Sequence, residues 1–347
     1  MKAKRYYLEA LRVLAMLLVM FNHSPAYLSL EGRGVAGYVS SMACSMVCKC
    51  AVPLFFMISG AVLLGKNESL SELYRKRIAR MILVLVLISL LFYLKMVFRG
   101  DIAFSFPGFI NLMLTDVLFL PYWYLYAYLG FLAILPFLRA MAQHLTREHI
   151  VYLVILQLAF KVVFYGIEGF TGWHFSGYLL DSLEVMFAIV VFYPLVGYGL
   201  DCLMKEDEGR GRELILCNLL LAATIVVTGI LVHQDYLKTG AYRELYLGFG
   251  TSIAAITLFL DCRALFGRES VPEPAKKVLV FLGDKVFGIY LLEGFIGLNG
   301  KMDVIYRFLS PYLGFMLAYF VEILAVFCLR LGLVTVAKRL PVLRGLL

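Results

Sequence analysis

The sequence predicts an all-α, polytopic membrane protein with about ten transmembrane helices and both termini in the cytoplasm. Hydrophobic residues make up 62% of the 347 residues and charged residues only 16%, a composition typical of a chain surrounded mostly by lipid. About ten apolar runs are long enough to cross a bilayer. Lys and Arg residues concentrate in alternate loops, which is the pattern that the positive-inside rule describes for a multispanning protein.

The expected spans are the apolar runs between polar or turn-forming segments. The first run follows a basic start without a small-residue cleavage site, which favours a retained helix over a signal peptide. The second run is longer than a bilayer needs, so we expect it to begin on the outer surface and to enter the membrane near Lys49. The predicted spans are residues 7–24, 36–64, 79–98, 120–138, 150–166, 178–200, 214–232, 243–261, 278–298 and 313–337.

The orientation follows from the distribution of Lys and Arg. The two ends of the chain and the even-numbered loops hold 20 of these residues, whereas the odd-numbered loops hold six. This bias places both termini in the cytoplasm and also accounts for the net charge of +8, which in a soluble protein could suggest nucleic acid. We therefore expect one integral membrane domain over residues 1–347, with the lipid bilayer as a partner and no nucleic acid.

The first span carries two ionisable residues in an otherwise apolar helix, Arg12 and His23. They are eleven positions apart, which returns to within about 20° of the same helix face, about 16 Å further along the axis. Ionisable groups at membrane depth are costly and mark functional sites by default. The alternative is that Arg12 snorkels to the near interface and His23 lies in the opposite headgroup layer.

Further charges inside the apolar runs predict a polar cavity, wider toward the outside, with a narrower basic part inside. Some of these residues could instead anchor helix ends, as Lys95 and Lys161 can by snorkelling. We expect Arg12, Lys285 and Arg330 in the inner halves of their helices. The charges expected in the outer halves are His23, Lys49, Lys95, Lys161, Asp181, Glu184, Glu293 and Glu322.

Three short segments complete the candidate site. The basic segment Tyr74–Arg80 places Arg77 and Arg80 on one helix side, where they suit a topology signal, an anionic lipid or the phosphates of a nucleotide. The aromatic segment Pro121–Gly130 suits an interfacial belt or a platform for a sugar ring or acyl chain. Ser59 and Gly60 allow close approach of another backbone or of a thin ligand.

The seven cysteines lack metal-ligand spacing and His partners, so we expect reduced thiols, no disulfide framework and no metal site.

These segments together resemble acyltransferase family 3, polytopic membrane proteins often met as bacterial O-acyltransferases of surface polysaccharides. The resemblance runs nearly end to end. It is carried by Arg12 and His23 with ten residues between them, by PLFFMISG, by Lys76-Arg77-x-x-Arg80, by YWYLYAYLG and by FGIYLLEG. Many members have a histidine near the position where this chain has Glu293, so any role of that histidine is in question here.

The resemblance implies ten core helices, an essential histidine on the first helix and arginines that serve a cytoplasmic acyl-CoA donor, with acetyl-CoA the expected form. His23 would be the catalytic base or acyl carrier, and Glu293 could orient it and stabilise its charge. The residues expected to bind the donor are Arg12, Lys76, Arg77 and Arg80. The residues expected to contact the substrates are Ser59, Trp123, Tyr124, Tyr128 and Tyr290.

The function that this implies is transfer of an acetyl or short acyl group from acyl-CoA to a hydroxyl of a cell-surface carbohydrate or lipid-linked glycan. Two alternatives remain open. The cavity charges would also suit a membrane transporter or flippase of polysaccharide or of a small solute. The second alternative is a catalytically silent sensor or partner subunit. The presence of Arg12, His23 and the basic segment disfavours it.

Overall fold

The computed structural model describes residues 5–24, 34–171, 186–204, 211–240, 248–267, 271–296 and 303–346. These residues are mainly helical and contain no strand, which confirms the all-α class. Asp181, Glu184 and the first part of the predicted span 178–200 lie outside them. The helices are α1 (Tyr6–Asn22), α2 (Gly34–Cys48), α3 (Ala51–Leu63), α4 (Leu70–Leu73), α5 (Ala79–Phe98), α6 (Phe106–Thr115), α7 (Trp123–His144), α8 (Arg147–Thr171), α10 (Phe192–Tyr198), α11 (Arg212–Thr239), α12 (Gly248–Phe266), α13 (Glu273–Gly283), α14 (Val286–Leu291), α15 (Asp303–Leu313), α16 (Phe315–Ala337) and α17 (Pro341–Arg344).

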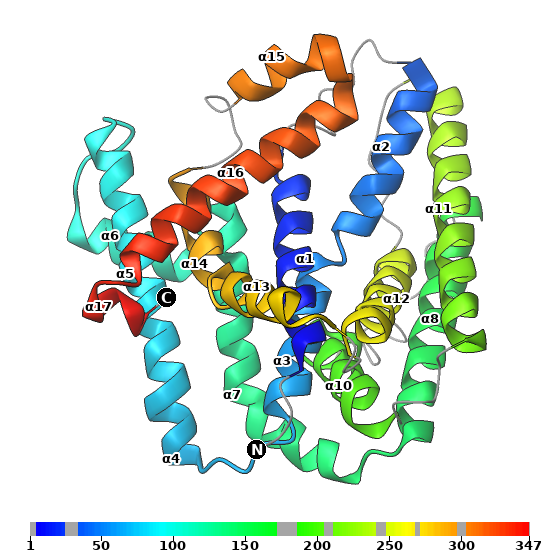
Figure 1. Cartoon of the computed structure of the whole chain (residues 1–347), viewed down its shortest axis with the longest axis horizontal. Helices are drawn as coiled ribbons and strands as arrows, with labels where there is room; N and C mark the ends of the chain where they lie inside the picture. Colours follow the sequence, from blue (N-terminus) through cyan, green and yellow to red (C-terminus); the bar gives the residue numbers. More distant parts are fainter. Residues whose placement is uncertain are drawn as a thin grey trace.

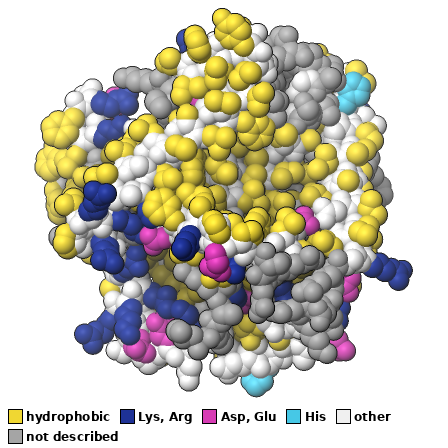
Figure 2. Space-filling view, viewed as in Figure 1, with side chains coloured by type: hydrophobic (Ala, Val, Ile, Leu, Met, Phe, Trp, Pro, Cys, Tyr) yellow, Lys and Arg dark blue, Asp and Glu magenta, His cyan; other side chains and the backbone are white. Residues whose placement is uncertain are grey.

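Five helical segments in the described residues are long and apolar enough to cross a membrane. Apolar side chains cover much of the upper part of the face in Figure 2, whereas Lys and Arg gather toward the lower left, around α4 and the start of α5. Ten spans and cytoplasmic termini stay predictions. The five segments are Ala43–Leu63, Leu70–Phe98, Leu120–His144, Arg212–Thr239 and Leu317–Ala337.

Helix α1 lies at the centre of the molecule and contacts α2, α3, α12, α13, α14 and α16 (Figure 1). It is apolar on nearly all sides, which is typical of a helix surrounded by protein. Its first half packs into an apolar cluster with α3, α7, α10 and α12. Its second half packs into another with α5, α14 and α16. Helix α1 therefore joins the two clusters.

Helices α3 and α10 touch backbone to backbone. A Cβ atom at Gly60 would overlap the backbone carbonyl of Pro194, and one at Gly197 would overlap the carbonyl of Met57. The expected close approach of another backbone at Gly60 is therefore confirmed. Such contacts need glycine on both helices, because any side chain would hold the two axes apart.

This contact predicts a strong effect of a single methyl group. Gly60→Ala is expected to destabilise the fold by about 3 kcal/mol, since the Pro194 backbone cannot yield as a side chain can. Gly130→Ala is the matched control: nothing lies within 4 Å of that position, and alanine there should stabilise helix α7 by about 0.5–1 kcal/mol. Thermal unfolding in detergent measures both. Equal Tm values for Gly60→Ala and wild type would contradict the contact.

The predicted span 278–298 is not one helix. Helix α13 ends at Gly283, α14 runs only from Val286 to Leu291, and a 3₁₀ turn, η5 (Leu292–Gly294), follows. The expectation of one continuous helix was therefore wrong here, while the crossing of a membrane by this segment stays a prediction. The carbonyl groups of Leu291, Gly294 and Ile296 accept hydrogen bonds from side chains of other segments. These hydrogen bonds compensate for the helical ones that are lost at the interruption. The interruption carries Glu293.

Candidate functional site

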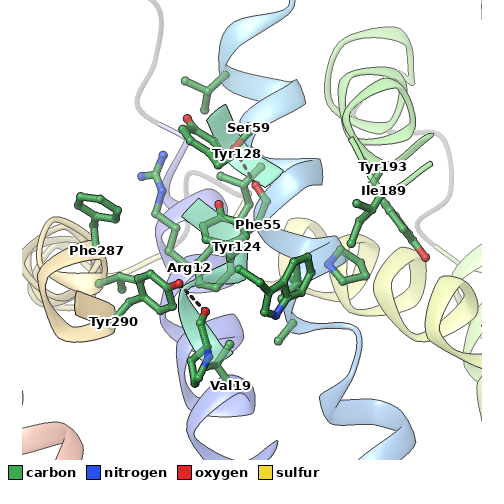
Figure 3. Close-up of a pocket in the computed structure, with 18 of the residues that line it drawn as sticks. Arg12, Val19, Phe55, Ser59, Tyr124, Tyr128, Ile189, Tyr193, Phe287 and Tyr290 are labelled. Atoms are coloured by element: carbon green, nitrogen blue, oxygen red, sulfur yellow. Dashed lines mark hydrogen bonds between the residues drawn. The ribbon is translucent and has the colours of Figure 1, made fainter. Parts of the chain in front are cut away.

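A cavity of about 850 Å³ lies among α1, α3, α5, α7, α10 and α14 (Figure 3). Arg12 enters it from α1, Tyr290 and Phe287 from α14, and Tyr193 from α10 on the opposite side. The lining has five basic side chains, Arg12, Lys49, Lys76, Arg77 and Arg80, together with His23. No Asp or Glu belongs to the described lining. This one-sided charge suits a ligand with several negative charges.

Ten of the eleven residues that the sequence assigned to a site line this one cavity. Glu293, the eleventh, does not line it and lies behind His23 instead. The structure thus brings the candidates together, while the role of each remains a prediction. The ten are Arg12, His23, Ser59, Lys76, Arg77, Arg80, Trp123, Tyr124, Tyr128 and Tyr290.

His23 lies at the C-terminal end of α1, where its main chain makes a turn. Its Nδ1 is 2.8 Å from Oε1 of Glu293. The Glu293 side chain is only 3% exposed, whereas that of His23 is 28% exposed. An ionised carboxylate accepts hydrogen bonds only, so Nδ1 is assigned as the protonated nitrogen and Nε2 is left with its lone pair. The pair therefore has the form of a base oriented by a buried acid.

Hydrogen bonds from neighbouring segments hold the turn that carries Glu293. The Tyr122 hydroxyl donates to the Leu291 carbonyl (2.8 Å), and the Lys95 ammonium donates to the Gly294 carbonyl (2.5 Å). Tyr122 is 1% exposed, so this turn is fixed from the protein interior. Lys95 therefore contacts protein backbone here, in addition to lying over the ring of Phe92.

Arg330 approaches Glu293 from helix α16. Its Nη1 is 3.9 Å from Glu293 Oε2, and its Nε and Nη2 donate to the Ile296 carbonyl at 2.8 and 2.5 Å. Its side chain is fully buried. We expected Arg330 in the inner half of its helix and Glu293 in the outer half of its own. The structure brings the two side chains together, because the chain turns after α14 and carries the carboxylate toward α16. Their depths in a membrane stay predictions. Arg330 supplies a positive charge behind the His23–Glu293 pair.

Four cations of the lining are held by groups that do not line the cavity. Arg12 pairs with Glu9 (2.6 Å), Lys76 with Glu72 (2.7 Å) and Arg77 with Glu68 (2.9 Å). The Arg80 Nη2 donates to the Leu346 carbonyl (3.2 Å). We call Arg12, Lys76, Arg77 and Arg80 the basic cluster. Arg77 and Arg80 do share one side of the chain, as their spacing predicted, although a π-helical turn, η2 (Tyr74–Ile78), opens the helix there.

Aromatic rings form the part of the lining contributed by α3 and α7. Tyr124 contacts Tyr290 and Tyr128 with ring centroids 5.8 Å apart in each case. The Ser59 hydroxyl donates to the Phe55 carbonyl one turn earlier (2.8 Å), so its oxygen can still accept a hydrogen bond but its proton is engaged (Figure 3). This wall presents apolar ring surface and suits a thin, weakly polar chain or a sugar face.

The comparison with protein families agrees with this arrangement. A family model described as an acyltransferase domain matches residues 5–338. The chain belongs to this acyltransferase family. The resemblance to acyltransferase family 3 is thereby confirmed over nearly the whole chain, and the family together with the apolar helices supports a membrane acyltransferase in the broad sense. No curated protein and no solved structure gives a significant match to this acyltransferase-family chain.

Sequence reasoning missed some polar residues of the acyltransferase-family site. Asn22 and Thr251 line the cavity, and the side-chain oxygens Asn22 Oδ1 and Thr251 Oγ1 have no hydrogen-bond partner in the described part of the chain. The position of Asn22 next to His23 was the available signal. Thr251 lies in an ordinary apolar run, α12, and nothing in the sequence distinguishes it. Both oxygens could serve a polar group of a ligand.

Proposed function

We propose that this protein is an integral membrane acyltransferase that moves an acetyl or short acyl group from acyl-CoA to a hydroxyl of a cell-surface carbohydrate or lipid-linked glycan. One observation carries the proposal. The same cavity holds His23, oriented by a buried carboxylate, and a basic cluster with no carboxylate in the described lining. A base and a polyanion site in one cavity are the two parts that transfer from a coenzyme A thioester requires.

The proposed reaction uses His23 as a general base. Its Nε2 takes the proton of the acceptor hydroxyl while the oxygen attacks the thioester carbonyl carbon. The tetrahedral intermediate then collapses, the carbon–sulfur bond breaks, and the proton on His23 passes to the departing coenzyme A thiolate. Glu293 keeps Nδ1 protonated and stabilises the imidazolium between these steps, with its own charge balanced by Arg330.

The basic cluster is assigned to the donor. Coenzyme A carries a diphosphate and a 3′-phosphate, and planar guanidinium groups bind phosphates through paired hydrogen bonds. Arg77 and Arg80 offer two such groups on one side of the cavity, and Arg12 lies on α1, the helix that ends at His23. A donor whose phosphates lie at the basic cluster would extend its thioester along α1 toward His23.

The acceptor is assigned to the remaining lining. Trp123 and Tyr128 offer ring faces for a sugar, and the unpartnered side-chain oxygens of Asn22 and Thr251 can accept hydrogen bonds from its hydroxyl groups.

We place both termini and the donor in the cytoplasm, since the loop charges favour this orientation.

The test is transfer from acetyl-CoA by the purified protein in lipid nanodiscs, followed with radiolabelled donor and an extract of lipid-linked glycans. Incorporation of label into the glycan fraction supports the proposal. Transport of glycan across the bilayer without any covalent transfer would favour the transporter alternative and overturn it.

The donor assignment predicts a selective kinetic defect. Arg80→Gln is expected to raise KM for acetyl-CoA by about 10- to 100-fold with little change in kcat, because a charge-assisted hydrogen bond contributes about 1.5–3 kcal/mol. Arg75→Gln is the matched control, since Arg75 is exposed in the preceding π-helical turn η2 but does not line the cavity. Initial rates at varied donor concentration measure both. Equal KM values for the two variants would contradict the assignment.

A further inference from the structure

Glu68 joins a guanidinium of the cavity lining to one outside it. Its two carboxylate oxygens share the single Nε–H of Arg77 in a bifurcated hydrogen bond, at 2.9 and 3.2 Å, and one of them accepts a second hydrogen bond from Arg139 Nη2 at 2.9 Å. Arg77 lines the cavity, whereas Glu68 and Arg139 do not. This contact could not be predicted from the sequence, because Glu68 lies in a polar loop and Arg139 in the last turns of α7, 71 positions later.

Arg139 fixes the loop that carries Glu68. Its Nε donates to the Leu63 carbonyl at the end of α3 (3.1 Å), and its Nη1 donates to the Glu68 main-chain carbonyl (3.4 Å). The side chains of Arg139 and Glu68 are 8% and 10% exposed. One buried guanidinium therefore satisfies a carbonyl at a helix end and holds both the backbone and the carboxylate of Glu68.

The contact engages one edge of Arg77. A guanidinium has five N–H donors, and Glu68 takes the one on Nε. In the described residues, no acceptor is hydrogen-bonded to the two terminal amino groups of Arg77. The hydrogen bonds from Arg77, and secondarily those from Arg139, lower the pKa of the Glu68 carboxyl from 4.5 to about 2, although burial opposes this. Glu68 is therefore ionised at neutral pH and holds the Arg77 side chain in place.

We propose that Glu68, fixed by Arg139, is a positioning residue that sets the terminal amino groups of Arg77 for a phosphate of the donor. This inference rests on the proposed function. A free arginine must give up its rotamer freedom when a phosphate arrives, whereas the contact with Glu68 already restricts the rotamers of Arg77. Arg139 matters because a carboxylate on a mobile loop could not fix its partner.

The neighbouring pair of Lys76 and Glu72 shows what an ordinary surface contact looks like here. Its 2.7 Å ion pair joins two exposed side chains one helical turn apart, 67% and 48% exposed. Pairs of this kind restrict their side chains little and contribute little. Glu72 thus offers a matched control: it is the same residue type, on the same segment, and it also pairs with a cation of the lining.

The experiment compares Glu68→Gln, Arg139→Lys and Glu72→Gln in nanodiscs with two donors, acetyl-CoA and S-acetyl-pantetheine, which lacks the nucleotide and its phosphates. Glu68→Gln is expected to raise KM for acetyl-CoA roughly two- to ten-fold, with kcat and the kinetics with acetyl-pantetheine unchanged. Arg139→Lys should reproduce this effect, because lysine cannot make the three contacts at once. Glu72→Gln should match wild type with both donors.

Each other outcome overturns the inference. A wild-type KM for acetyl-CoA in Glu68→Gln shows that Arg77 does not need Glu68. An equal defect with both donors shows a general structural effect, which a lower Tm would accompany. If wild type uses acetyl-pantetheine as well as acetyl-CoA, the phosphates are not recognised and the inference fails, although acyl transfer itself stands. If wild type transfers from neither donor, the proposed function fails as well.

Discussion

Replacing His23 with alanine is expected to lower the rate of acyl transfer by about 10²- to 10⁴-fold, the range that a general base contributes. The Nε2 lone pair would be lost, and no other side chain of the described lining is a base of similar strength. The donor should still bind, because the basic cluster is untouched. Single-turnover transfer from labelled acetyl-CoA measures the rate, and equilibrium binding of coenzyme A measures the cluster.

His144→Ala is the control for this experiment, since His144 is exposed at the far end of α7 and does not line the cavity. It should keep wild-type activity. If His23→Ala also keeps it while remaining folded, His23 is not the base and the site assignment is wrong. A stable labelled adduct on His23 in wild type would instead identify an acyl carrier, which uses the same nitrogen.

The second large effect is expected for Glu293→Gln. Glutamine keeps the size of the side chain but removes the charge, and its amide can donate as well as accept. His23 would then no longer be held in the form that leaves Nε2 free, and we expect kcat to fall about 10²-fold with donor KM unchanged. Arg330 would also lose its negative partner in a buried site, so stability should fall by about 3–5 kcal/mol.

Because stability and catalysis change together in this variant, the two must be measured separately. Kinetics at a temperature well below the Tm of the variant report on catalysis, and thermal unfolding reports on the buried pair. Glu213→Gln is the control, as it removes an exposed partner of Arg147 on α11 and should change neither quantity appreciably. A wild-type kcat for Glu293→Gln would mean that the carboxylate does not orient His23.

Much of the helical pattern could be predicted because apolar runs report directly on burial in lipid or protein. The predicted span 79–98 coincides with α5. A turn separates α2 from α3 at Lys49, where we expected the chain to enter the membrane, and that entry stays a prediction. The interruption around Asp284 was missed, because it lies in a run that stays apolar on both sides. Hydropathy does not register where backbone hydrogen bonds pass from the helix to neighbouring side chains.

The site was predictable as a set of residues but not as an arrangement. Arg12 and His23 lie on one helix, so their periodicity alone places them on one side. The resemblance to the family suggested that Glu293 could orient His23, 270 positions away, but it did not supply the geometry of that contact. The contact of Glu293 with Arg330 depends on the interruption after α14 and was not predicted. Nothing in the sequence marks Glu68 as part of the site, because a carboxylate in a polar loop is common and its partners are distant in the sequence.

The backbone contact between α3 and α10 has a mechanical consequence. Carriers that rock between inward- and outward-open forms need a seam along which two halves can slide. Here Gly60 and Gly197 let each helix contact the main chain of the other. If the helices slid by one residue, neighbouring side chains would clash with the main chain at these contacts. We therefore expect α3 and α10 to keep their relative position during turnover. The thioester and the hydroxyl would then both diffuse into a cavity whose walls do not rearrange.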